Sequence, residues 1–528
     1  MGGHSHGLGV GVSPRHVESS GAYGPFATAH DRAVAGRYEQ RAADWRLGAV
    51  VYQVMVDRFV APTDLESKRD RYEPWMRLRD WSEIPTVGTY VEAQRVWSHE
   101  IDFWGGELAG VRSKIDHIAA IGADVLYLNP IFHASTNHGY DATDYFAIAP
   151  WLGTQEDLHA LVHDVHARGQ KIVLDGVFNH VGLANTIFRQ AQADPSSPYR
   201  SWFAFGEQYP GGVRAWALAE SLPELEIDNP AVSSFLWSGP DSVVRSYLRD
   251  GVDGWRLDVA FELGVGHLAA LTEAAHGERP GSLTVGEVPC YAAEWLGPLD
   301  GVLHWNLRKV LIEIGRGRLS AAHGQRILER AYADADYEHM LASWLFVDNH
   351  DTARLPDEVP NPAAQVLVRT LQFTLPGSPV VYYGSEVGMT GGEAPGLRAP
   401  MRWDLLSPEN PWLRLTPTLT GLRKEHPALR VGDLRWFDTE KLIGFERRTD
   451  LAAQSVVVLA NPSDTEVTEL VQLVDSKLLH TLVDALGSGA ELAPIQGMLE
   501  VRLAPWAVLV LVPRTGEPGG YQPYKRVQ

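Results

Sequence analysis

Residues 251–260 read GVDGWRLDVA, and the fold can be worked out from this stretch outward. Glycines at 251 and 254 indicate a turn that leads into a short apolar run, which Arg256 and Asp258 interrupt. In a strand, side chains two positions apart point to the same face. A cation and a carboxylate therefore share one side of a strand that is expected to be buried. Burying such a pair costs desolvation energy, so it is either a structural ion pair or part of a functional site.

Apolar runs of strand length recur on both sides of this stretch, and helical patterns separate several of them. One example is the stretch that Thr154 can cap, whose apolar face is Leu158, Leu161, Val162 and Val165 and which closes at Gly169. Eight strand-like runs are predicted, at 49–59, 125–132, 171–178, 254–260, 283–288, 301–307, 345–351 and 379–384. This α/β alternation predicts a parallel (β/α)8 TIM barrel, with its active site at the carboxyl ends of the strands.

Two regions depart from the barrel pattern. Residues 181–235 lack periodic runs and are predicted to form a small domain inserted after the third strand, domain B. After residue 428 short strands replace helices, which predicts an all-β sandwich over 429–515. The predicted division is thus a lead-in (1–48), the barrel (49–180 and 236–428), the inserted domain, the sandwich and a tail (516–528). The Gly- and His-rich composition of residues 1–16 predicts a flexible tail rather than a metal site.

Composition excludes several classes of partner. The chain of 528 residues has 46 Lys and Arg against 66 Asp and Glu, a formal net charge of −20. Such a chain is not expected to bind nucleic acid or an anionic membrane surface. A single cysteine, Cys290, leaves no disulfide within the chain and no cysteine-based metal site. The sequence shows no signal-peptide pattern and no apolar run of membrane-spanning length, so a cytoplasmic location is expected.

Polar residues follow the apolar runs at four predicted strand ends. They are Asp175, Asn179 and His180 after the third strand, Arg256 and Asp258 at the fourth, Glu287 at the fifth, and Asn349, His350 and Asp351 at the seventh. One such residue is more often a structural hydrogen-bonding group than a catalyst. Three carboxylates, two histidines and an arginine converging on one barrel mouth instead indicate a catalytic site.

Glycoside hydrolysis needs two carboxylates, and a third can hold substrate hydroxyls. Arg256 beside Asp258 favours the ionised carboxylate and is expected to lower the pKa of Asp258, which suits a nucleophile. Glu287 follows an apolar strand and has carboxylates as neighbours. That setting suits a general acid, which must hold a proton at neutral pH.

These residues lie in motifs that resemble the α-amylase family of glycoside hydrolases, and most nearly its cyclomaltodextrinase, neopullulanase and maltogenic amylase group. The motifs occur in the family's order along the chain. They are HGYDATDY (138–145), DGVFNH (175–180), LPELEIDNP (222–230), GWRLDVA (254–260), VGEV (285–288) and VDNHD (347–351).

The resemblance implies a retaining mechanism on α-glucosidic bonds. Asp258 is then the nucleophile, Glu287 the acid and base, and Asp351 the carboxylate that holds the hydroxyls of the distorted sugar. Asp175 and His138 are expected to support the site from behind. The substrate-binding set implied by the resemblance is Tyr140, as a stacking floor, with His180, Arg256, His350, His138 and Arg354.

The resemblance implies an oligosaccharide substrate and no cofactor. A structural calcium ion is not supported, because VAPTDLESKRD (60–70) stands where the group has an Asp- and Asn-rich loop. The group's additional N-terminal β domain is not expected within residues 1–48, so the sequence leaves monomer and homo-oligomer open. Pro289 and Cys290 stand where the group often has an aromatic acceptor residue.

Four functions stay open at this point. The first is hydrolysis of short or cyclic α-1,4-glucans, and its nearest rival is α-glucosyl transfer or α-glucosidase action on maltose, sucrose or related glucosides. A non-catalytic binding barrel is disfavoured because all three carboxylates are present. A metal-dependent hydrolase is disfavoured because the histidines lack the two-His spacing of a zinc helix.

Overall fold

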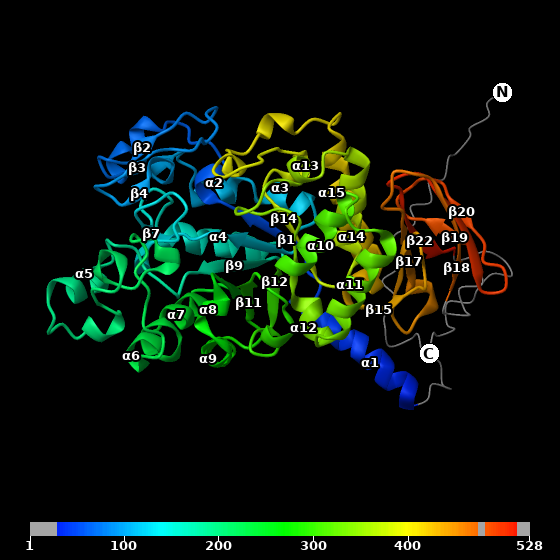
Figure 1. Ribbon diagram of the computed structural model, residues 1–528, viewed down its shortest axis with the longest axis horizontal. Helices are drawn as coiled ribbons and strands as arrows, with labels where there is room; N and C mark the ends of the chain where they lie inside the picture. The colour runs from blue at the N-terminus through cyan, green and yellow to red at the C-terminus, as the bar shows by residue number, and fades with distance from the viewer. Residues whose placement is uncertain (1–28, 474–480, 515–528) are drawn as a thin grey trace, which may run out of the picture.

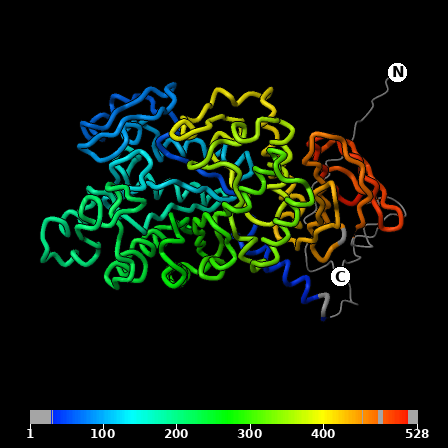
Figure 2. Tube along the Cα trace, viewed as in Figure 1, coloured from blue at the N-terminus to red at the C-terminus, as the bar shows by residue number. Residues whose placement is uncertain are grey.

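The computed structural model describes residues 29–473 and 481–514, shown in Figure 1. The predictions for residues 1–16 and for the tail at 516–528 lie outside the described residues. A central barrel occupies the middle of the molecule, and a separate set of strands near the C-terminus packs at one end (Figures 1 and 2). Among the described residues, every helix falls short of the length and apolarity that crossing a membrane requires.

Eight parallel strands close into the predicted barrel, in the order β1-β14-β13-β12-β11-β10-β9-β6. The strands are β1 (Val51–Val54), β6 (Val125–Leu128), β9 (Lys171–Gly176), β10 (Gly254–Leu257), β11 (Leu283–Val288), β12 (Gly301–His304), β13 (Trp344–Leu345) and β14 (Ser378–Tyr382). Each of the eight predicted apolar runs supplies one strand. Gly254 allows β10 to approach β11 closely, because a Cβ at this position would lie 2.5 Å from the carbonyl oxygen of Leu283.

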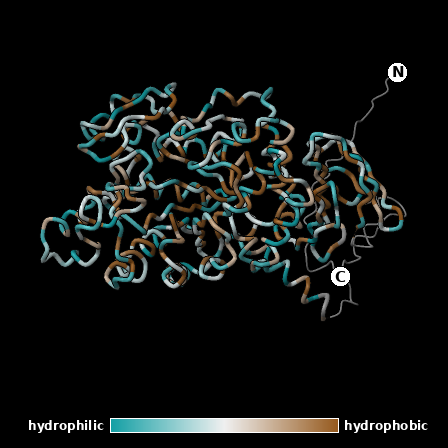
Figure 3. Tube along the Cα trace, in the orientation of Figure 1, coloured by the Kyte–Doolittle hydropathy of each residue, from teal (hydrophilic) through white to brown (hydrophobic). Residues whose placement is uncertain are grey.

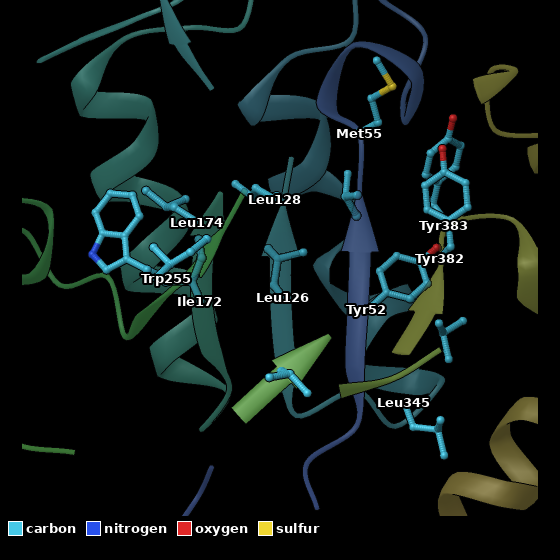
Figure 4. Packing of buried hydrophobic residues seen from close by; sticks show 14 of the residues in the cluster. Tyr52, Met55, Leu126, Leu128, Ile172, Leu174, Trp255, Leu345, Tyr382 and Tyr383 are labelled. Atoms are coloured by element: carbon cyan, nitrogen blue, oxygen red, sulfur yellow. The ribbon is translucent and has the colours of Figure 1, made fainter. Parts of the chain in front are cut away.

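Both faces of the barrel strands are buried, as expected for parallel strands inside a ring of helices. The barrel interior is filled by one apolar cluster, which includes Val51, Tyr127, Val173, Val285 and Trp344. A larger cluster lies between the strands and the helices. Figure 4 shows part of it, with Leu126 on β6, Ile172 and Leu174 on β9, and Trp255 on β10. Apolar residues accordingly gather along the barrel strands in Figure 3.

Helices cover the outside of the barrel. The longer ones are α4 (Gln155–Ala167), α7 (Val243–Arg249), α9 (Val265–Glu278), α10 (Trp305–Gly315), α11 (Ala321–Ala333), α14 (Pro362–Thr374) and α15 (Pro411–Glu425), with shorter ones at α2 (Leu108–Ser113), α3 (Ile115–Ala120), α8 (Ala260–Leu263), α12 (Tyr337–Ala342), α13 (Leu355–Glu358) and α16 (Pro427–Val431). Helix α4 begins as predicted, because the Thr154 side chain accepts a hydrogen bond from the Asp157 amide and the two residues form a capping box. Helix α1 (Ala29–Ala43) precedes the barrel.

Two long connections leave the barrel at its carboxyl-terminal side. The first, between β1 and α2, contains β2 (Arg77–Leu78), β3 (Tyr90–Val91), β4 (Val96–Trp97) and β5 (Asp102–Phe103). The second follows β9 and holds the short helices α5 (Thr186–Ala193) and α6 (Pro230–Ser233) with irregular chain between them. Strands β7 (Phe132–Ala134) and β8 (Ala142–Ile148) pair with each other. In Figure 1, β2 to β4 lie close to β7, at the end of the molecule away from the C-terminal strands.

The C-terminal region is all β, as predicted. A six-stranded sheet has the order β15-β16-β17-β22-β19-β20, and β18 pairs with β21 in a second sheet. These strands are β15 (Asp433–Trp436), β16 (Ile443–Arg448), β17 (Val456–Ala460), β18 (Val467–Gln472), β19 (Leu482–Asp484), β20 (Glu491–Leu492), β21 (Met498–Leu503) and β22 (Val508–Pro513). Residues of both sheets, among them Val457, Val471, Val501 and Leu511, form one buried cluster between them.

Candidate active site

A cavity of about 420 Å³ opens at the carboxyl ends of the barrel strands. Cavities of this size suit small ligands. Its walls come from several barrel strand ends and from both long connections. The lining residues are Glu100, His138, Tyr140, His180, Trp216, Leu222, Asp258, Val259, Phe261, Glu287, Pro289, Trp305, Asp351 and Arg398.

Arg256 is the centre of the charged cluster at the floor of this cavity, and its side chain is fully buried. Its Nη1 lies 2.7 Å from Asp175 Oδ1 and 2.9 Å from Asp258 Oδ1, and its Nη2 lies 2.7 Å from Glu287 Oε2. One guanidinium therefore holds three carboxylates, two of which line the cavity. Arginine suits this role because its planar fork presents several donors in fixed directions.

Strand register explains why these residues meet. Arg256 pairs with Asp175 across β10 and β9. On the other side it pairs with Val285 of β11, so Glu287 stands two residues farther along the same face. Asp258 likewise follows Arg256 by two positions. The alternation of a strand thus brings together residues that are about eighty and thirty positions apart in the chain.

The backbone turns sharply just after Asp258. Val259 has φ 39° and ψ 44°, a left-handed conformation that is unusual for a β-branched residue. Its amide donates a hydrogen bond of 3.3 Å to Glu287 Oε2, which ties the two candidate catalytic residues together. Strain of about 1–3 kcal/mol at such a position persists only where the surrounding structure enforces it, and it is concentrated at functional sites.

Arg256 acts on Asp258 in the expected direction, because its charge lowers the pKa of the carboxyl, but the net shift of that pKa is upward. Burial raises the pKa of the Asp258 carboxyl well above its usual range, and the charges of Glu287 and Asp175 act in the same sense. Arg256 opposes this shift without overcoming it. The reason is that Asp258 shares one cation with two other carboxylates in a site removed from water. Three carboxylates around one guanidinium favour the retention of one proton within the cluster.

Asp351 has the opposite environment. Burial opposes its ionisation, but the neighbouring His350 and Arg398 outweigh burial and lower the pKa of Asp351 far below its usual range. His350 Nε2 lies 2.9 Å from one carboxylate oxygen, and Arg398 Nη2 donates to the other at 3.1 Å. Gln53 Nε2 lies 2.8 Å from His350 Nδ1, which assigns the histidine proton to Nε2, facing Asp351.

Tyr140 and Asp175 connect the two halves of the site. The Tyr140 hydroxyl donates to Asp175 Oδ2 at 2.8 Å and lies 2.6 Å from His350 Nε2. The rings of Tyr140 and His350 are parallel within 8° at a centroid distance of 5.5 Å. Asp175 is buried beneath the cavity lining and also accepts from the Tyr127 hydroxyl at 2.6 Å. Asp175 thus supports the site from behind, while Tyr140 faces the cavity.

The two other predicted histidines also line the cavity. His180 Nε2 lies 3.1 Å from the carbonyl oxygen of Tyr140, and burial lowers the pKa of His180 to about 4. A neutral His180 that donates from Nε2 presents Nδ1 as an acceptor. His138 Nε2 lies 3.5 Å from a carboxylate oxygen of Glu100. His138 was predicted both to back the site and to bind substrate, and the structure places it in the cavity wall.

Three of the residues predicted to bind substrate do not line the cavity. Arg256 and His350 lie behind it and contact its carboxylates, whereas the contacts of Arg354 lie elsewhere. The Arg354 side chain is fully buried, and its guanidinium donates to the carbonyl oxygens of Tyr383 at 2.6 Å and Leu397 at 3.2 Å. It also lies over the ring of Tyr382, 4.3 Å from the centroid. The resemblance implied a substrate contact for Arg354, but the turn after β13 directs its side chain into the protein interior.

Sequence reasoning missed four lining residues that the geometry identifies as important. Arg398 holds Asp351 and also donates to the carbonyl oxygen of His350 at 2.7 Å. Trp216 stacks on His180, with ring centroids 5.5 Å apart. Phe261 and Trp305 supply apolar wall. Arg398 is the first residue of the stretch RAPMRWD (398–404), and Trp216 lies six residues before the motif LPELEIDNP (222–230). Neither residue lies in a periodic pattern that would have signalled its role.

The site is built for acid–base and nucleophilic chemistry by carboxylates. Within residues 29–473 and 481–514, no group of three or more His, Cys, Asp or Glu side chains is arranged to hold a metal ion.

Comparison with known proteins agrees with this geometry. The model of the family described as "Alpha amylase, catalytic domain" matches residues 53–425. The chain belongs to the α-amylase family. It is therefore a glycoside hydrolase of that family, and the match spans the barrel and both long connections.

Several individual proteins of known activity are similar to this α-amylase family member. Neopullulanase 2 of Thermoactinomyces vulgaris is 30% identical over 483 residues, covering 89% of this chain and 78% of the relative. A cyclomaltodextrinase of a Bacillus species is 29% identical over 465 residues, covering 86% and 77%. Among solved structures, the cyclic α-maltosyl-(1→6)-maltose hydrolase of Arthrobacter globiformis has a TM-score of 0.75 at 29% identity, covering 89% of this chain and all of that one.

Proposed function

We propose that this enzyme hydrolyses α-glucosidic bonds, mainly α-1,4, in short or cyclic malto-oligosaccharides with retention of configuration. The observation that carries the proposal is the convergence of Asp258, Glu287 and Asp351 in one cavity of about 420 Å³. Relatives named cyclomaltodextrinase and cyclic α-maltosyl-(1→6)-maltose hydrolase support the substrate class. A cytoplasmic location belongs to the same proposal, supported by a relative named intracellular maltogenic amylase.

In the first step, the Asp258 carboxylate attacks the anomeric carbon while Glu287 gives its proton to the departing glycosidic oxygen. The carbon–oxygen bond breaks, and a β-glucosyl ester on Asp258 forms. Arg256 contacts both carboxylates and holds them in the relative position that this transfer requires.

In the second step, Glu287, now ionised, takes a proton from water. The resulting nucleophile attacks the anomeric carbon and releases Asp258 as a carboxylate. Asp351, kept ionised by His350 and Arg398, accepts hydrogen bonds from the hydroxyls of the sugar whose bond is cleaved. Tyr140 offers a ring face to that sugar, and His180 offers Nδ1. Retention also predicts a separation of about 5–5.5 Å between the carboxyl groups of Asp258 and Glu287.

Transfer of the glucosyl group to a second sugar is the rival outcome of the second step. One observation favours it. The cavity wall beyond Asp258 and Glu287 is apolar, with Val259, Phe261 and Pro289, and such a wall can receive a sugar ring in place of water.

The test is a product analysis with maltotriose, β-cyclodextrin, pullulan, sucrose and trehalose, followed by proton NMR in the first minutes of reaction. We expect maltose and glucose from maltotriose and β-cyclodextrin, and trisaccharides that retain the α-1,6 bond from pullulan, with the α anomer appearing first. Initial release of the β anomer would contradict retention, and activity on trehalose or sucrose alone would overturn the substrate class. Dominance of longer oligosaccharides at modest substrate concentration would establish the transferase instead.

A further inference from the structure

A second cavity, of about 360 Å³, adjoins the catalytic cavity. We call it the side chamber. Its walls are the hairpin formed by β3 and β4 (residues 90–97) and the segment 216–222 of the connection after β9. Glu100, His138, Trp216 and Leu222 line both cavities, so the two spaces are direct neighbours.

Two aromatic side chains of the hairpin are unusually exposed in the side chamber. Trp97 is 47% exposed and Tyr90 is 43% exposed, and their rings meet edge to face at 5.8 Å. The Trp97 ring also packs on His99, at 6.3 Å between centroids. These contacts hold Trp97 in a fixed position while leaving nearly half of it open. Such a surface is apolar and flat, which suits the carbon-bound face of a sugar ring.

The opposite wall is strained. Ala217 and Leu218, which follow Trp216, have φ values of 49° and 62°. Two successive left-handed residues that are not glycine are costly, and such positions are concentrated at binding sites. The Trp216 amide donates to the Leu222 carbonyl oxygen at 2.9 Å, which closes this segment into a compact loop. The loop sets Trp216 at the junction of the two cavities.

An ion pair spans the two walls. Arg95, at the tip of the hairpin, lies 3.1 Å from Glu220 of the opposite loop. Arg95 also has a left-handed φ of 56°. Both side chains are more than one third exposed, so the pair is weak and can open and close.

Glu100 couples the side chamber to the catalytic cavity. One of its carboxylate oxygens accepts from the Trp97 amide at 2.5 Å, and the other lies 3.5 Å from His138 Nε2. The carboxylates of Glu100, Asp141 and Glu220 outnumber Arg95 among the charged lining groups, which disfavours an anionic ligand. Carboxylates beside aromatic rings match a neutral ligand with many hydroxyl donors.

We propose that the side chamber binds a glucosyl unit of the same oligosaccharide that the catalytic cavity cleaves, with Trp97 as the stacking surface. The proposal rests on the proposed function and adds a determinant of chain-length preference to it. Maltotriose is too short to depend on both spaces, whereas maltohexaose can extend from one into the other.

The test compares Trp97→Ala with the control Phe146→Ala. Phe146 is 46% exposed and lines neither cavity, so it matches Trp97 in exposure alone. We expect Trp97→Ala to raise KM for maltohexaose about 5- to 10-fold, the scale of one lost aromatic contact, with kcat changed less than about twofold. Maltotriose kinetics should stay within about twofold, and Phe146→Ala should leave both substrates unchanged.

An equal effect on both substrates, or no effect on maltohexaose, would overturn the proposal. A second measurement separates it from the proposed function. Calorimetric binding of maltotriose and maltohexaose to Asp258→Asn, with and without Trp97→Ala, needs no turnover. The proposal predicts that Trp97→Ala weakens only maltohexaose binding, by about 5- to 10-fold. Unchanged maltohexaose affinity would refute it, whereas absent hydrolysis by the wild-type enzyme would refute only the proposed function.

Discussion

Buried arginines lie at both ends of the barrel, and their partners differ. At the carboxyl ends of the strands, Arg256 contacts three carboxylates. At the amino ends, Arg423 donates to the carbonyl oxygens of Gly48, Phe373 and Gly377. Arg447 of β16 donates there to the carbonyl oxygens of Thr374, Leu429 and Gly432.

The difference in partners shifts the pKa of the two buried arginines in opposite directions. Burial opposes the charge of Arg256, but Asp175 and Glu287 outweigh it and raise its pKa. Burial dominates at the other end and lowers the pKa of Arg423 to about 9. The lesson is that burial of a cation does not by itself mark a catalytic site. Neutral carbonyl partners join the barrel to the C-terminal strands, whereas several acidic partners around one cation create groups that can exchange protons.

The largest expected effect is a loss of activity from substitutions at the carboxyl ends of the barrel strands. Asp258→Asn and Glu287→Gln should each lower kcat by about 10⁴-fold, because each removes a group that forms or breaks a bond. At pH 7 their midpoints of thermal unfolding should fall by no more than about 3 °C relative to the wild type. Maltotriose hydrolysis and a thermal scan measure both quantities. Full activity in either variant would show that Asp258 or Glu287 is not catalytic. A large loss of stability would show that the charged cluster around Arg256 is mainly structural.

The next effect concerns stability at the opposite end. Arg447→Met should lower the free energy of unfolding by about 3–5 kcal/mol, because it leaves buried carbonyl oxygens without a charged donor. Its kcat/KM at 25 °C should change less than about twofold. Urea unfolding and steady-state kinetics test this pair of expectations.

A matched control is Arg502→Met in the same C-terminal region. The Arg502 side chain is 73% exposed and pairs with Glu466 at the surface, so this change should cost less than about 1 kcal/mol. Equal losses of unfolding free energy in Arg447→Met and Arg502→Met would show that the carbonyl contacts of Arg447 do not stabilise the fold.

The smallest expected effect is a pH dependence of stability that comes from Asp258 and Asp351 at the catalytic cavity. An unfolded aspartate has a pKa of about 3.9. The raised pKa of Asp258 gives stability that is complete below this value and is lost as pH rises through the folded pKa. The lowered pKa of Asp351 gives stability that is present above about 3.9 and is lost as pH falls through the folded pKa.

Asp258→Asn should therefore gain unfolding temperature over the wild type, by about 2–4 °C, as pH rises from about 4 to 8. Asp351→Asn should be less stable than the wild type at pH 7, with the deficit shrinking toward acid pH. Thermal scans across this range measure both. Parallel curves for the wild type and both variants would contradict the opposite charge environments of the two aspartates.

The barrel could be predicted because each strand is a continuous apolar run that ends in polar residues, and because eight such runs fill one closed barrel. Asp175, Arg256, Asp258 and Glu287 could be placed together because register and alternation follow from strand geometry. Arg398 could not be placed in the site from the sequence, because it lies 47 residues after Asp351. It reaches Asp351 only through the path of the chain that follows β14.

Two features of the site could not be predicted, for the same physical reason. The sequence shows that Arg256 neighbours Asp258, but not that the guanidinium is shared with Asp175 and Glu287 in a site closed to water. Likewise, the sequence shows Arg354 near Asp351, but not the turn that buries it against carbonyl oxygens. Proximity along the chain indicates a possible partner, whereas burial and the number of competing partners decide the outcome.

The most direct test of the central claim is covalent trapping of the nucleophile. The enzyme is incubated with 5-fluoro-α-D-glucosyl fluoride, digested with protease and analysed by mass spectrometry. We expect one glucosylated peptide, containing GVDGWRLDVA with the sugar on Asp258, and no labelling of Asp258→Asn. A sugar attached to Glu287, or fluoride release without any labelled peptide and with an inverted product, would contradict this expectation.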